Sequence, residues 1–336
     1  MSPTFSFLVM GAGAWGSALA IHLARRGHHV VLWGHSSPTM DALLKTRRHE
    51  KYLPNIPFPE NIALTSDLKQ AFELAGNRAM VLLVVPSSAF EQITQQLKPF
   101  LTKETPIIWG TKGLSEDGEL FHVICRQNCG PRPLSVLSGP SFAMEVARGL
   151  PTATTIATES PVLGEQLVNA FHSEMFRVYL SSDLVGVELG GAIKNVLAIA
   201  VGMSDGLGFG ANARAALITR GLAELCRLGE KMGAQMSTMM GLSGVGDIVL
   251  TCTDNQSRNR RFGLALGQGK TADEAERAIA QVVEGKMNVK QVMLLAGKQG
   301  VELPICQQVY SVLYEGRTPK QAVMQLLTRP PKIETA

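Results

Sequence analysis

The first half of the chain alternates short apolar runs with helical patterns. The apolar runs are continuous rather than alternating, as in strands that are covered on both faces. Helical stretches such as Ser17–Arg26 and Ala89–Leu97 separate these runs. This alternation predicts an α/β domain built on a doubly wound, mostly parallel sheet. Its predicted strands are Phe5–Met10, Val30–Trp33, Met80–Val85, Ile107–Trp109 and Ser135–Leu137.

The pattern changes near Asp183. Before it, two further predicted strands, Ala153–Ala157 and Phe176–Leu180, flank a helix at 161–172 and are expected to extend the sheet at one edge. After Asp183, helical segments such as Asn212–Lys231 follow one another with little strand signal. The second half of the chain is therefore predicted to be all-helical.

Two helix starts in the second half carry capping signals. Thr271-x-x-Glu274 has the form of a capping box. Thr318-Pro319-x-Gln321 combines an N-cap, a first-turn proline and a glutamine at the third position. The last residues, Arg329–Ala336, resemble a frayed tail. With 336 residues the chain is long enough for two domains, which we place at residues 1–183 and 184–330.

Composition excludes several classes of protein. Apolar residues make up 45% of the chain and charged residues 18%, with a formal net charge of +4. This mild excess suits an anionic small molecule, whereas nucleic acid binding needs a dense basic tract that is absent here. The five cysteines lack the spacing of a zinc site or a disulfide framework, so we expect no metal and a reducing, cytoplasmic setting.

No membrane or export segment is predicted. The most apolar stretch, Leu189–Ser204, carries Lys194 and Asn195 near its middle and is too short to span a bilayer. The N-terminus leads directly into a predicted strand, without the basic and apolar segments of a signal peptide.

A glycine-rich turn, Gly11-x-Gly13-x-x-Gly16, lies between the first predicted strand and the first predicted helix. Its glycines suit a tight turn, a close approach of backbone to a pyrophosphate, and close packing of helix on strand. The helix N-terminus adds unpaired N–H groups for the anion. In this context the motif predicts a Rossmann-like dinucleotide-binding domain; a purely structural glycine turn is the alternative.

The end of the second strand indicates which dinucleotide is bound. NAD-specific folds usually place Asp or Glu about 20 residues after the glycine turn, where the carboxylate holds the ribose 2′-hydroxyl. Here the strand is followed by His35 and Ser36, which can donate hydrogen bonds, and Arg47 or Arg48 can approach. The sequence therefore predicts a preference for NADP(H) over NAD(H), with a solvated loop histidine as the alternative interpretation.

Lys194 is isolated in an apolar helical stretch that is expected to be buried. Gly190 and Gly191, one turn earlier, are expected to leave space for a ligand beside the ammonium group. A desolvated lysine has a lowered pKa, which suits a general acid or base near neutral pH. A lysine that extends to solvent is the alternative.

Asp247 is isolated in the same way, within Gly244–Thr251. A buried carboxylate needs a partner, and Lys194 is the obvious candidate. The alternative is an aspartate that caps a helix or a turn.

Three other segments carry ligand-binding chemistry. Gly110–Leu114, which includes Lys112, and Gly139–Ala143 each follow a predicted strand, where ligands bind in open α/β sheets. Asn255–Arg261 gathers hydroxyl, amide and guanidinium donors, a set that suits a phosphate monoester. A solvated charged loop is the alternative for this last segment.

Taken together, these segments resemble the bacterial type of NAD(P)-dependent glycerol-3-phosphate dehydrogenase, over nearly the whole chain. The resemblance implies an oxidoreductase that interconverts sn-glycerol 3-phosphate and dihydroxyacetone phosphate by hydride transfer and supplies glycerol 3-phosphate for phospholipid synthesis. It also implies a homodimer. The motifs that carry it are Gly11–Gly16, Trp33–His35, Gly110–Leu114, Gly139–Ala143, Glu188–Gly202, Gly241–Asp247, Ser257–Gly263 and Val283–Gly285.

The resemblance implies roles for individual residues. Lys194 is implied as the acid/base on the carbinol oxygen, with Lys112 and Asp247 beside it in the catalytic set. Position 14 is often serine in the family, and Ala14 lacks that hydroxyl donor. The implied substrate-binding residues are Lys112, Gly139, Ser141, Lys194, Asp247, Ser257, Arg258 and Asn259. The implied cofactor-binding residues are Gly11, Gly13, Ala14, Trp15, Gly16, His35, Lys112, Ala143, Arg258, Val282 and Glu284.

The sequence leaves two other functions open. A related two-domain NADP-dependent dehydrogenase of β-hydroxyacids or sugar-acid phosphates has the same plan and also uses a lysine of the helical domain. The donor cluster at Ser257–Asn259 and the run Gly241–Asp247 favour glycerol phosphate instead. A non-enzymatic NADP-sensing regulator needs the glycine turn but not Lys194, Asp247 and the donor cluster together.

Overall fold

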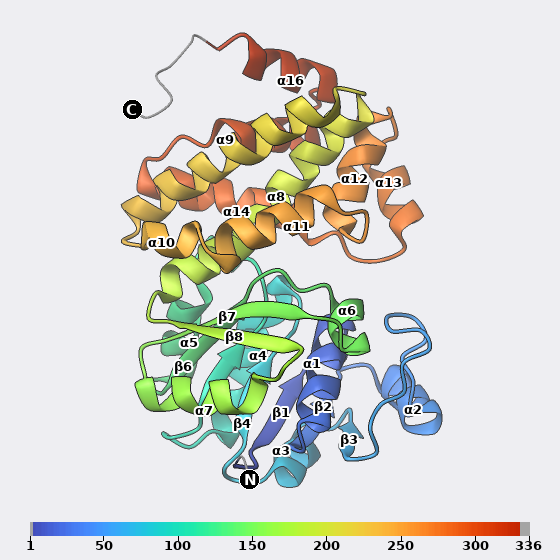
Figure 1. Ribbon diagram of the computed structural model, residues 1–336, viewed down its shortest axis with the longest axis vertical. Helices are drawn as coiled ribbons and strands as arrows, with labels where there is room; N and C mark the ends of the chain where they lie inside the picture. Colours follow the sequence, from blue (N-terminus) through green and yellow to red (C-terminus); the bar gives the residue numbers. More distant parts are fainter. Residues whose placement is uncertain (1–2, 330–336) are drawn as a thin grey trace.

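The computed structural model describes residues 3–329, as an α/β half followed by a helical half (Figure 1). The strands form one sheet in the order β3-β2-β1-β4-β5-β6-β7-β8. The strands are β1 (Ser6–Met10), β2 (His29–Trp33), β3 (Ile62–Thr65), β4 (Met80–Leu83), β5 (Ile107–Trp109), β6 (Leu134–Ser138), β7 (Thr152–Thr158) and β8 (Phe176–Ser181).

The sheet is mostly parallel, as predicted. Strands β1 to β6 pair in parallel, so that Phe7 of β1 lies opposite Val30 of β2 and Met80 of β4. β7 runs antiparallel to β6, and β8 pairs in parallel with β7, which extends the sheet at its edge. Strand β3 was not among the strands predicted from the sequence. This strand is only four residues long, with apolar and polar members, and turn residues flank it. The flanking turn residues were the signal in the sequence that could have identified the strand.

Helices and irregular segments cover both faces of this sheet. Alternate residues of β1 belong to different apolar clusters, with Phe7 and Val9 in one and Leu8 and Met10 in the other. This is the physical reason for the continuous apolar runs. The helices of this half are α1 (Ala14–Arg25), α2 (Ser37–Thr46), α3 (Leu68–Ala75), α4 (Phe90–Leu97), α5 (Phe121–Cys129), α6 (Ala143–Arg148) and α7 (Pro161–Phe171).

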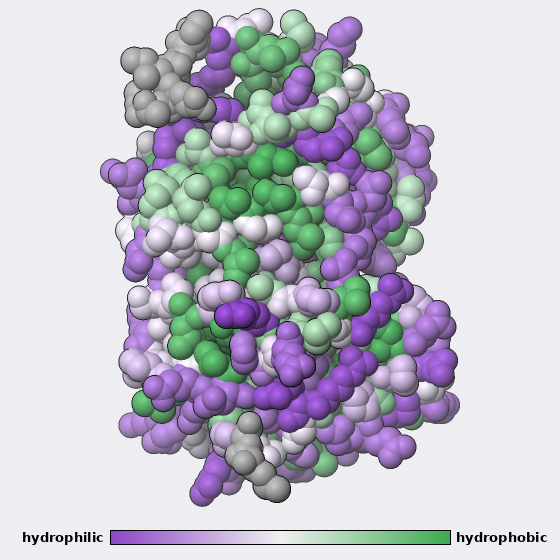
Figure 2. Space-filling model, viewed as in Figure 1, coloured by the Kyte–Doolittle hydropathy of each residue, from purple (hydrophilic) through white to green (hydrophobic). Residues whose placement is uncertain are grey.

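The helical half is organised around one long buried helix, α8, which packs against α9, α11, α12 and α14 and also reaches β6. Its helices are α8 (Leu184–Gly206), α9 (Gly210–Lys231), α10 (Met236–Met239), α11 (Asp247–Thr253), α12 (Arg258–Gly267), α13 (Ala272–Ile279), α14 (Glu284–Gln299), α15 (Pro304–Tyr314) and α16 (Pro319–Leu327). Apolar side chains lie over the α9 side of this half in Figure 2.

Helix α8 is longer than the apolar stretch recognised in the sequence. Among the described residues it is the one helix long and apolar enough to cross a membrane, so its length does not exclude a span. However, 94% of its apolar window is buried within the protein. We therefore assign α8 as a core helix on the evidence of its burial.

The predicted capping box at Thr271 and the predicted N-cap at Thr318 are confirmed, and the second is also a capping box. The Thr271 hydroxyl accepts from the backbone N–H of Glu274, whose carboxylate accepts from the N–H of Thr271. Thr318 and Gln321 make the same reciprocal pair at the start of α16. The predicted tail at Arg329–Ala336 lies outside the described residues, except for Arg329.

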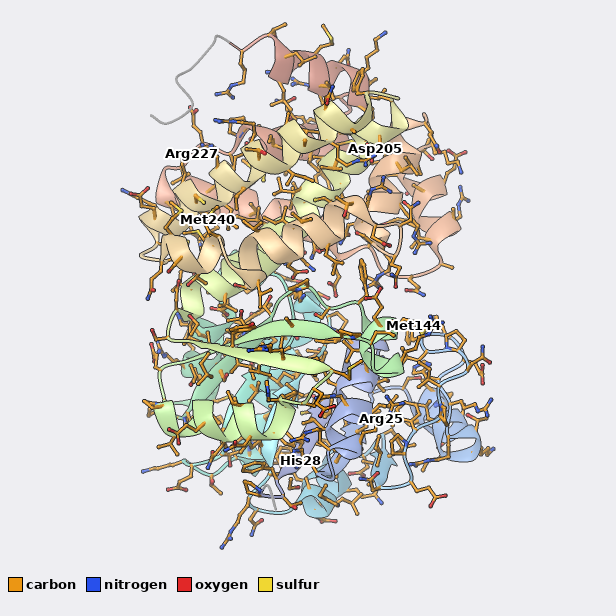
Figure 3. The ribbon with its side chains drawn as sticks, viewed as in Figure 1. Arg25, His28, Met144, Asp205, Arg227 and Met240 are labelled. Carbon is orange, nitrogen blue, oxygen red and sulfur yellow. The ribbon has the colours of Figure 1, made fainter. Side chains whose placement is uncertain are left out.

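Two histidines hold the C-terminal end of α7 against α1 and β2. His22 donates from Nε2 to the carbonyl of Phe171 at 2.7 Å, and His28 donates from Nε2 to the carbonyl of Ala170 at 3.0 Å. Arg25 donates to the carbonyl of Ala147 at 2.6 Å nearby, and Figure 3 labels both Arg25 and His28. Burial lowers the pKa of His22 to about 4, although its bond to Phe171 acts in the opposite direction.

The lowered pKa of His22 predicts a loss of stability in mild acid. Between pH 6.5 and pH 4 the unfolded chain takes up a proton at His22 that the folded chain does not, so folding becomes less favourable as pH falls. Because of His22, we expect the free energy of unfolding to fall by about 1–2 kcal/mol between pH 7.5 and pH 5. Urea unfolding at both values measures this loss. The variant His22→Gln keeps a donor but cannot titrate, so an equal loss in that variant would contradict the assignment.

Candidate active site

The glycine turn opens at the point of the sheet where strand order reverses, between β1 and β4. A Cβ atom at Gly11 would lie 2.3 Å from the carbonyl oxygen of Val84, and one at Gly16 would lie 1.9 Å from that of Gly11. Close backbone contacts therefore require glycine at both positions. Position 13 differs, because no atom lies within 4 Å of a Cβ built there. This open space at the N-terminus of α1 fits the approach of a pyrophosphate.

Further predicted cofactor residues surround this turn. Ala14 begins α1, and Trp15 directs its indole N–H toward Gly110, where an added Cβ would lie 2.9 Å from Nε1. Ala143 begins α6 after the β6 strand. His49, which sequence analysis did not single out, is buried and donates to the carbonyl of Ala12 at 2.9 Å. The turn is therefore held by contacts from three separate segments.

No aspartate or glutamate directly follows the C-terminal end of β2. His35 is exposed there, and the Ser36 hydroxyl accepts from Thr39 at 3.0 Å. One expectation was wrong: Arg47 does not extend toward this edge, because its guanidinium donates to the carbonyls of Ile62 and Pro59. Arg48 is exposed.

Lys112, Lys194 and Asp247 meet at one point between the two halves of the chain. Lys112 follows β5, Lys194 lies in the middle of α8, and Asp247 is the first residue of α11. The two ammonium groups bind different oxygens of the carboxylate, each at 2.7 Å. The side chains are 13%, 10% and 1% exposed in the same order. The predicted pairing of Asp247 with Lys194 is thus confirmed, and Lys112 joins it.

Each ammonium group has one N–H that binds no other residue within 3–329. Lys112 also donates to the carbonyl of Gly139 at 3.0 Å, and Lys194 also donates to the hydroxyl of Thr251 at 3.2 Å. A lysine ammonium has three donors, so two are used in each case and one is left. Thr251 was missed in the sequence, although its position one helical turn after Asp247 was an available signal.

The charges at this centre do not cancel, because two cations share one anion. Burial by itself would raise the pKa of Asp247, but Lys112 and Lys194 outweigh burial and hold the pKa below its usual value. Burial lowers the pKa of Lys112 to about 8, against the opposing attraction of Asp247. The centre therefore carries excess positive charge that suits an anionic or strongly polarised ligand.

Gly190 and Gly191 of α8 allow the close packing around the lysine centre. The prediction that these glycines leave space for a ligand is wrong. A Cβ at Gly190 would lie 2.2 Å from the carbonyl oxygen of Ser243, and one at Gly191 would lie 3.2 Å from Ser138 Oγ and 3.5 Å from Lys112 Cγ. The space beside these glycines is thus filled by protein atoms and is not left for a ligand. A π-helical turn at Leu242–Gly246 then delivers Asp247 to the lysines.

The predicted phosphate donors lie at the start of α12. Ser257 is the N-cap, and its oxygen accepts from the backbone N–H of Arg260, which leaves its own O–H to donate. Arg258 donates from Nη1 to the carbonyl of Val282 at 2.9 Å. Burial raises the pKa of Glu284, against the attraction of Arg258, Lys194 and Lys112. These residues therefore share the electrostatic environment of the lysine centre.

Arg260, which also belongs to the Asn255–Arg261 segment, makes structural contacts instead. Arg260 forms an ion pair with Asp205 at 2.5 Å and donates to the carbonyl of Cys252 at 3.0 Å, so it is not available to a phosphate. Asp205, labelled in Figure 3, also binds Arg214. Ser141 donates to the carbonyl of Gly139, the same oxygen that receives Lys112.

This fold and site define a class: nicotinamide-dependent dehydrogenases with an α/β half that opens on a glycine turn, a helical half, and a lysine–carboxylate centre built from both halves. Comparison with known sequences gives the family. Residues 6–163 match the model for the N-terminus of NAD-dependent glycerol-3-phosphate dehydrogenase, and residues 183–324 match that for its C-terminus. The chain belongs to the NAD-dependent glycerol-3-phosphate dehydrogenase family.

Individual relatives agree with this assignment. Glycerol-3-phosphate dehydrogenase [NAD(P)+] of Aeromonas hydrophila is 52% identical over 99% of this chain and 100% of its own length. The crystal structure of glycerol-3-phosphate dehydrogenase from Coxiella burnetii matches with a TM-score of 0.94 at 48% identity, over 97% of this chain and 99% of its own. A D-mandelate dehydrogenase matches with a TM-score of 0.61 at 12% identity, which is a likeness of fold alone.

The shared carboxylate predicts strong coupling between Asp247 and its lysines. Asp247→Asn leaves two buried ammonium groups without a counter-charge, so we expect the unfolding free energy to fall by about 3–5 kcal/mol. Adding Lys112→Met to this variant removes one uncompensated charge and should restore part of the loss. A double-mutant cycle by urea unfolding measures the coupling. Additive effects would contradict an energetic role for the Lys112–Asp247 pair.

Proposed function

We propose that this chain reduces dihydroxyacetone phosphate to sn-glycerol 3-phosphate with a nicotinamide cofactor, and catalyses the reverse oxidation. The observation that carries the proposal is the pair of ammonium groups held by Asp247, each with one free N–H, beside the donor-rich start of α12. A ketone oxygen and a phosphate monoester are the two ligand groups that these two sets of donors suit.

The chemistry at the ketone follows from the donors of the two lysines. The bound nicotinamide supplies or accepts the hydride at C2 of the substrate. The free N–H groups of Lys112 and Lys194 polarise the carbonyl oxygen. In reduction, the Lys194 ammonium gives its proton to that oxygen; in oxidation, the neutral amine takes it back. Asp247 keeps the two lysines together, and Thr251 orients Lys194.

The phosphate end of the substrate is assigned to the start of α12. The Ser257 hydroxyl, the remaining N–H groups of Arg258 and the amide of Asn259 are donors there, and the helix N-terminus adds a favourable dipole. Gly139 and Ser141 complete the substrate side near Lys112. A β-hydroxyacid has no phosphate for this donor set, which is why we prefer glycerol phosphate to the alternative substrates.

For the cofactor, we propose a preference for NADP(H), with NAD(H) also accepted. Support comes from the end of β2, where exposed His35 is followed by Ser36 and where no carboxylate repels a 2′-phosphate. Exposed Arg48 is a further candidate donor. The glycine turn with Ala14 and Trp15 is assigned to the pyrophosphate, and Ala143, Arg258, Val282 and Glu284 to the part of the cofactor near the substrate.

The wider setting is also a proposal. We assign residues 1–183 to the dinucleotide and residues 184–330 to the substrate. All five cysteines are free, which fits a reducing cytoplasm. A groove of about 1360 Å³ on the helical half includes Leu217 of α9 and Leu326 of α16, and we expect a second copy of the chain to cover it. The product is suited to phospholipid synthesis, as a glycerol already phosphorylated at one end.

A direct assay tests substrate and cofactor together. Dihydroxyacetone phosphate should be reduced with NADPH and with NADH, with the higher kcat/KM for NADPH, because no carboxylate opposes the 2′-phosphate. Cofactor oxidation is followed by the loss of absorbance of the reduced nicotinamide. A β-keto acid is the matched substrate that lacks the phosphate group. Faster turnover of the keto acid would contradict the proposed function.

A variant at the end of β2 is the control for the cofactor part of this assay. His35→Asp brings a carboxylate next to the 2′-position, so kcat/KM for NADPH should fall about 10-fold or more while that for NADH is kept. Equal effects on both cofactors, or a wild-type preference for NADH, would show that His35 does not select the cofactor.

The role of Lys194 is tested by its removal. Lys194→Ala should reduce kcat for dihydroxyacetone phosphate by ~10²–10⁴, because the proton donor is lost. The Kd for NADPH, measured by fluorescence, should remain close to that of the wild type. Lys298→Ala, which removes a half-exposed lysine that pairs with Glu119, is the matched control. Near-normal turnover of Lys194→Ala would remove this residue from the mechanism.

A further inference from the structure

Four amide side chains form a continuous hydrogen-bonded chain next to the lysine centre. Asn259 donates to Asn195 at 2.9 Å, Asn195 donates to Asn288 at 2.8 Å, and Asn288 donates to Gln291 at 2.9 Å. These residues come from α12, α8 and α14. We call this chain the amide relay. Asn195 is the residue after Lys194 on α8, and Asn259 is one of the proposed phosphate donors, so the relay begins at the proposed phosphate end of the site.

The direction of the amide relay is set by one backbone group. The N–H of Gly285 donates to Asn259 Oδ1 at 2.9 Å, and a backbone N–H can only donate. Asn259 must therefore use its nitrogen toward Asn195, and the same logic passes to Asn288 and Gln291. Asn259, Asn195 and Asn288 each accept one hydrogen bond and donate the next, and Gln291 accepts the last one, so each bond polarises the next.

Burial makes this direction costly to change. The four side chains belong to residues that are at most 8% exposed, and Asn288 and Gln291 are each 1% exposed. A buried amide that loses its partner in such surroundings destabilises the protein by the full desolvation penalty of the group. Among the described residues, Gln291 Nε2 is a buried donor without a partner, and the relay ends there.

The amide relay also supports the loop that carries Lys112. A Cβ at Gly113 would lie 2.7 Å from Asn288 Nδ2, so this loop packs directly on Asn288. Gly113 has a φ of +133°, which favours glycine at this contact. Position 288 is therefore tightly enclosed between the two halves of the chain.

We propose that Asn288 and Gln291 are positioning residues for phosphate recognition, acting through the amide relay on Asn259. The amide nitrogen of Asn259 has two N–H groups, of which the relay uses one. With the relay in its observed direction, the second N–H is a permanent donor at the start of α12. Gly285 holds the oxygen of Asn259, and Asn195 holds its nitrogen. Without the acceptor at Asn288, the Asn195 oxygen is no longer held toward Asn259, and the Asn259 amide loses one of the two contacts that keep its second N–H in place. This inference rests on the proposed function, which assigns the phosphate to this helix start.

Two substitutions at position 288 distinguish positioning from simple packing. Asn288→Leu keeps the size of the side chain but removes the acceptor for Asn195. Asn288→Asp keeps that acceptor, and the unpartnered Nε2 of Gln291 can turn to donate to the new carboxylate. The part of the relay that Asn259 and Asn195 form is therefore expected to be lost in Asn288→Leu and kept in Asn288→Asp.

The kinetic experiment uses the full-length enzyme with NADPH. Asn288→Leu should raise the KM for dihydroxyacetone phosphate and the Kd for sn-glycerol 3-phosphate by about 10-fold or more, with an unchanged Kd for NADPH. In Asn288→Asp these constants should stay within about 3-fold of the wild type. Asn169→Leu, which removes an exposed amide on α7, is the matched control. Equal constants in Asn288→Leu and the wild type, or equal impairment of both Asn288 variants, would overturn the proposal.

A spectroscopic readout separates the relay from the proposed function. Side-chain amide signals of ¹⁵N-asparagine-labelled protein report Asn195 and Asn259 without any substrate. These signals should shift in Asn288→Leu and remain in place in Asn288→Asp. Unchanged signals in Asn288→Leu would overturn the amide relay as a positioning device. A wild-type enzyme that does not reduce dihydroxyacetone phosphate would instead overturn the proposed function.

Discussion

The rest of the structure depends on one buried carboxylate, that of Asp247. A charged group this far from water is stable only with a close counter-charge, and here it binds two ammonium groups from different parts of the chain. Lys112 comes from the α/β half and Lys194 from the long core helix of the helical half. The same contact therefore joins the two halves, orders both lysines and leaves net positive charge facing the site.

Close backbone packing brings these charges together. Gly190 lets the segment before Asp247 lie against α8, and Gly191 admits the stem of Lys112. Asn195, the residue after Lys194, binds α14 and α12 through the amide relay. One helix thus carries Lys194, packs against the segment before its counter-charge and binds the donors assigned to the phosphate. Substitutions on α8 are expected to affect several functions at once for this reason.

Much of the fold was accessible from the sequence because its signals are local. Continuous apolar runs, glycine turns and capping boxes each depend on neighbouring residues, and the structure bears them out at β1, at Gly11–Gly16 and at Thr271. Besides the missed strand β3 and the underestimated length of α8, the errors concern contacts between distant segments. Arg47 binds the carbonyls of Pro59 and Ile62 rather than facing the end of β2, and the space beside Gly190 is taken by the backbone near Asp247. No local pattern contains that information.

The sequence by itself determined the two-part architecture, the dinucleotide turn and the isolation of Lys194 and Asp247 in apolar surroundings, because hydrophobic patterning and glycine spacing specify these features locally. Only the tertiary structure decided that Lys112 shares the carboxylate of Asp247, that burial lowers the pKa of Lys112, and that a single backbone N–H at Gly285 sets the direction of the amide relay. Charge sharing, desolvation and the direction of hydrogen bonds depend on groups that are far apart in the chain and meet only when it folds.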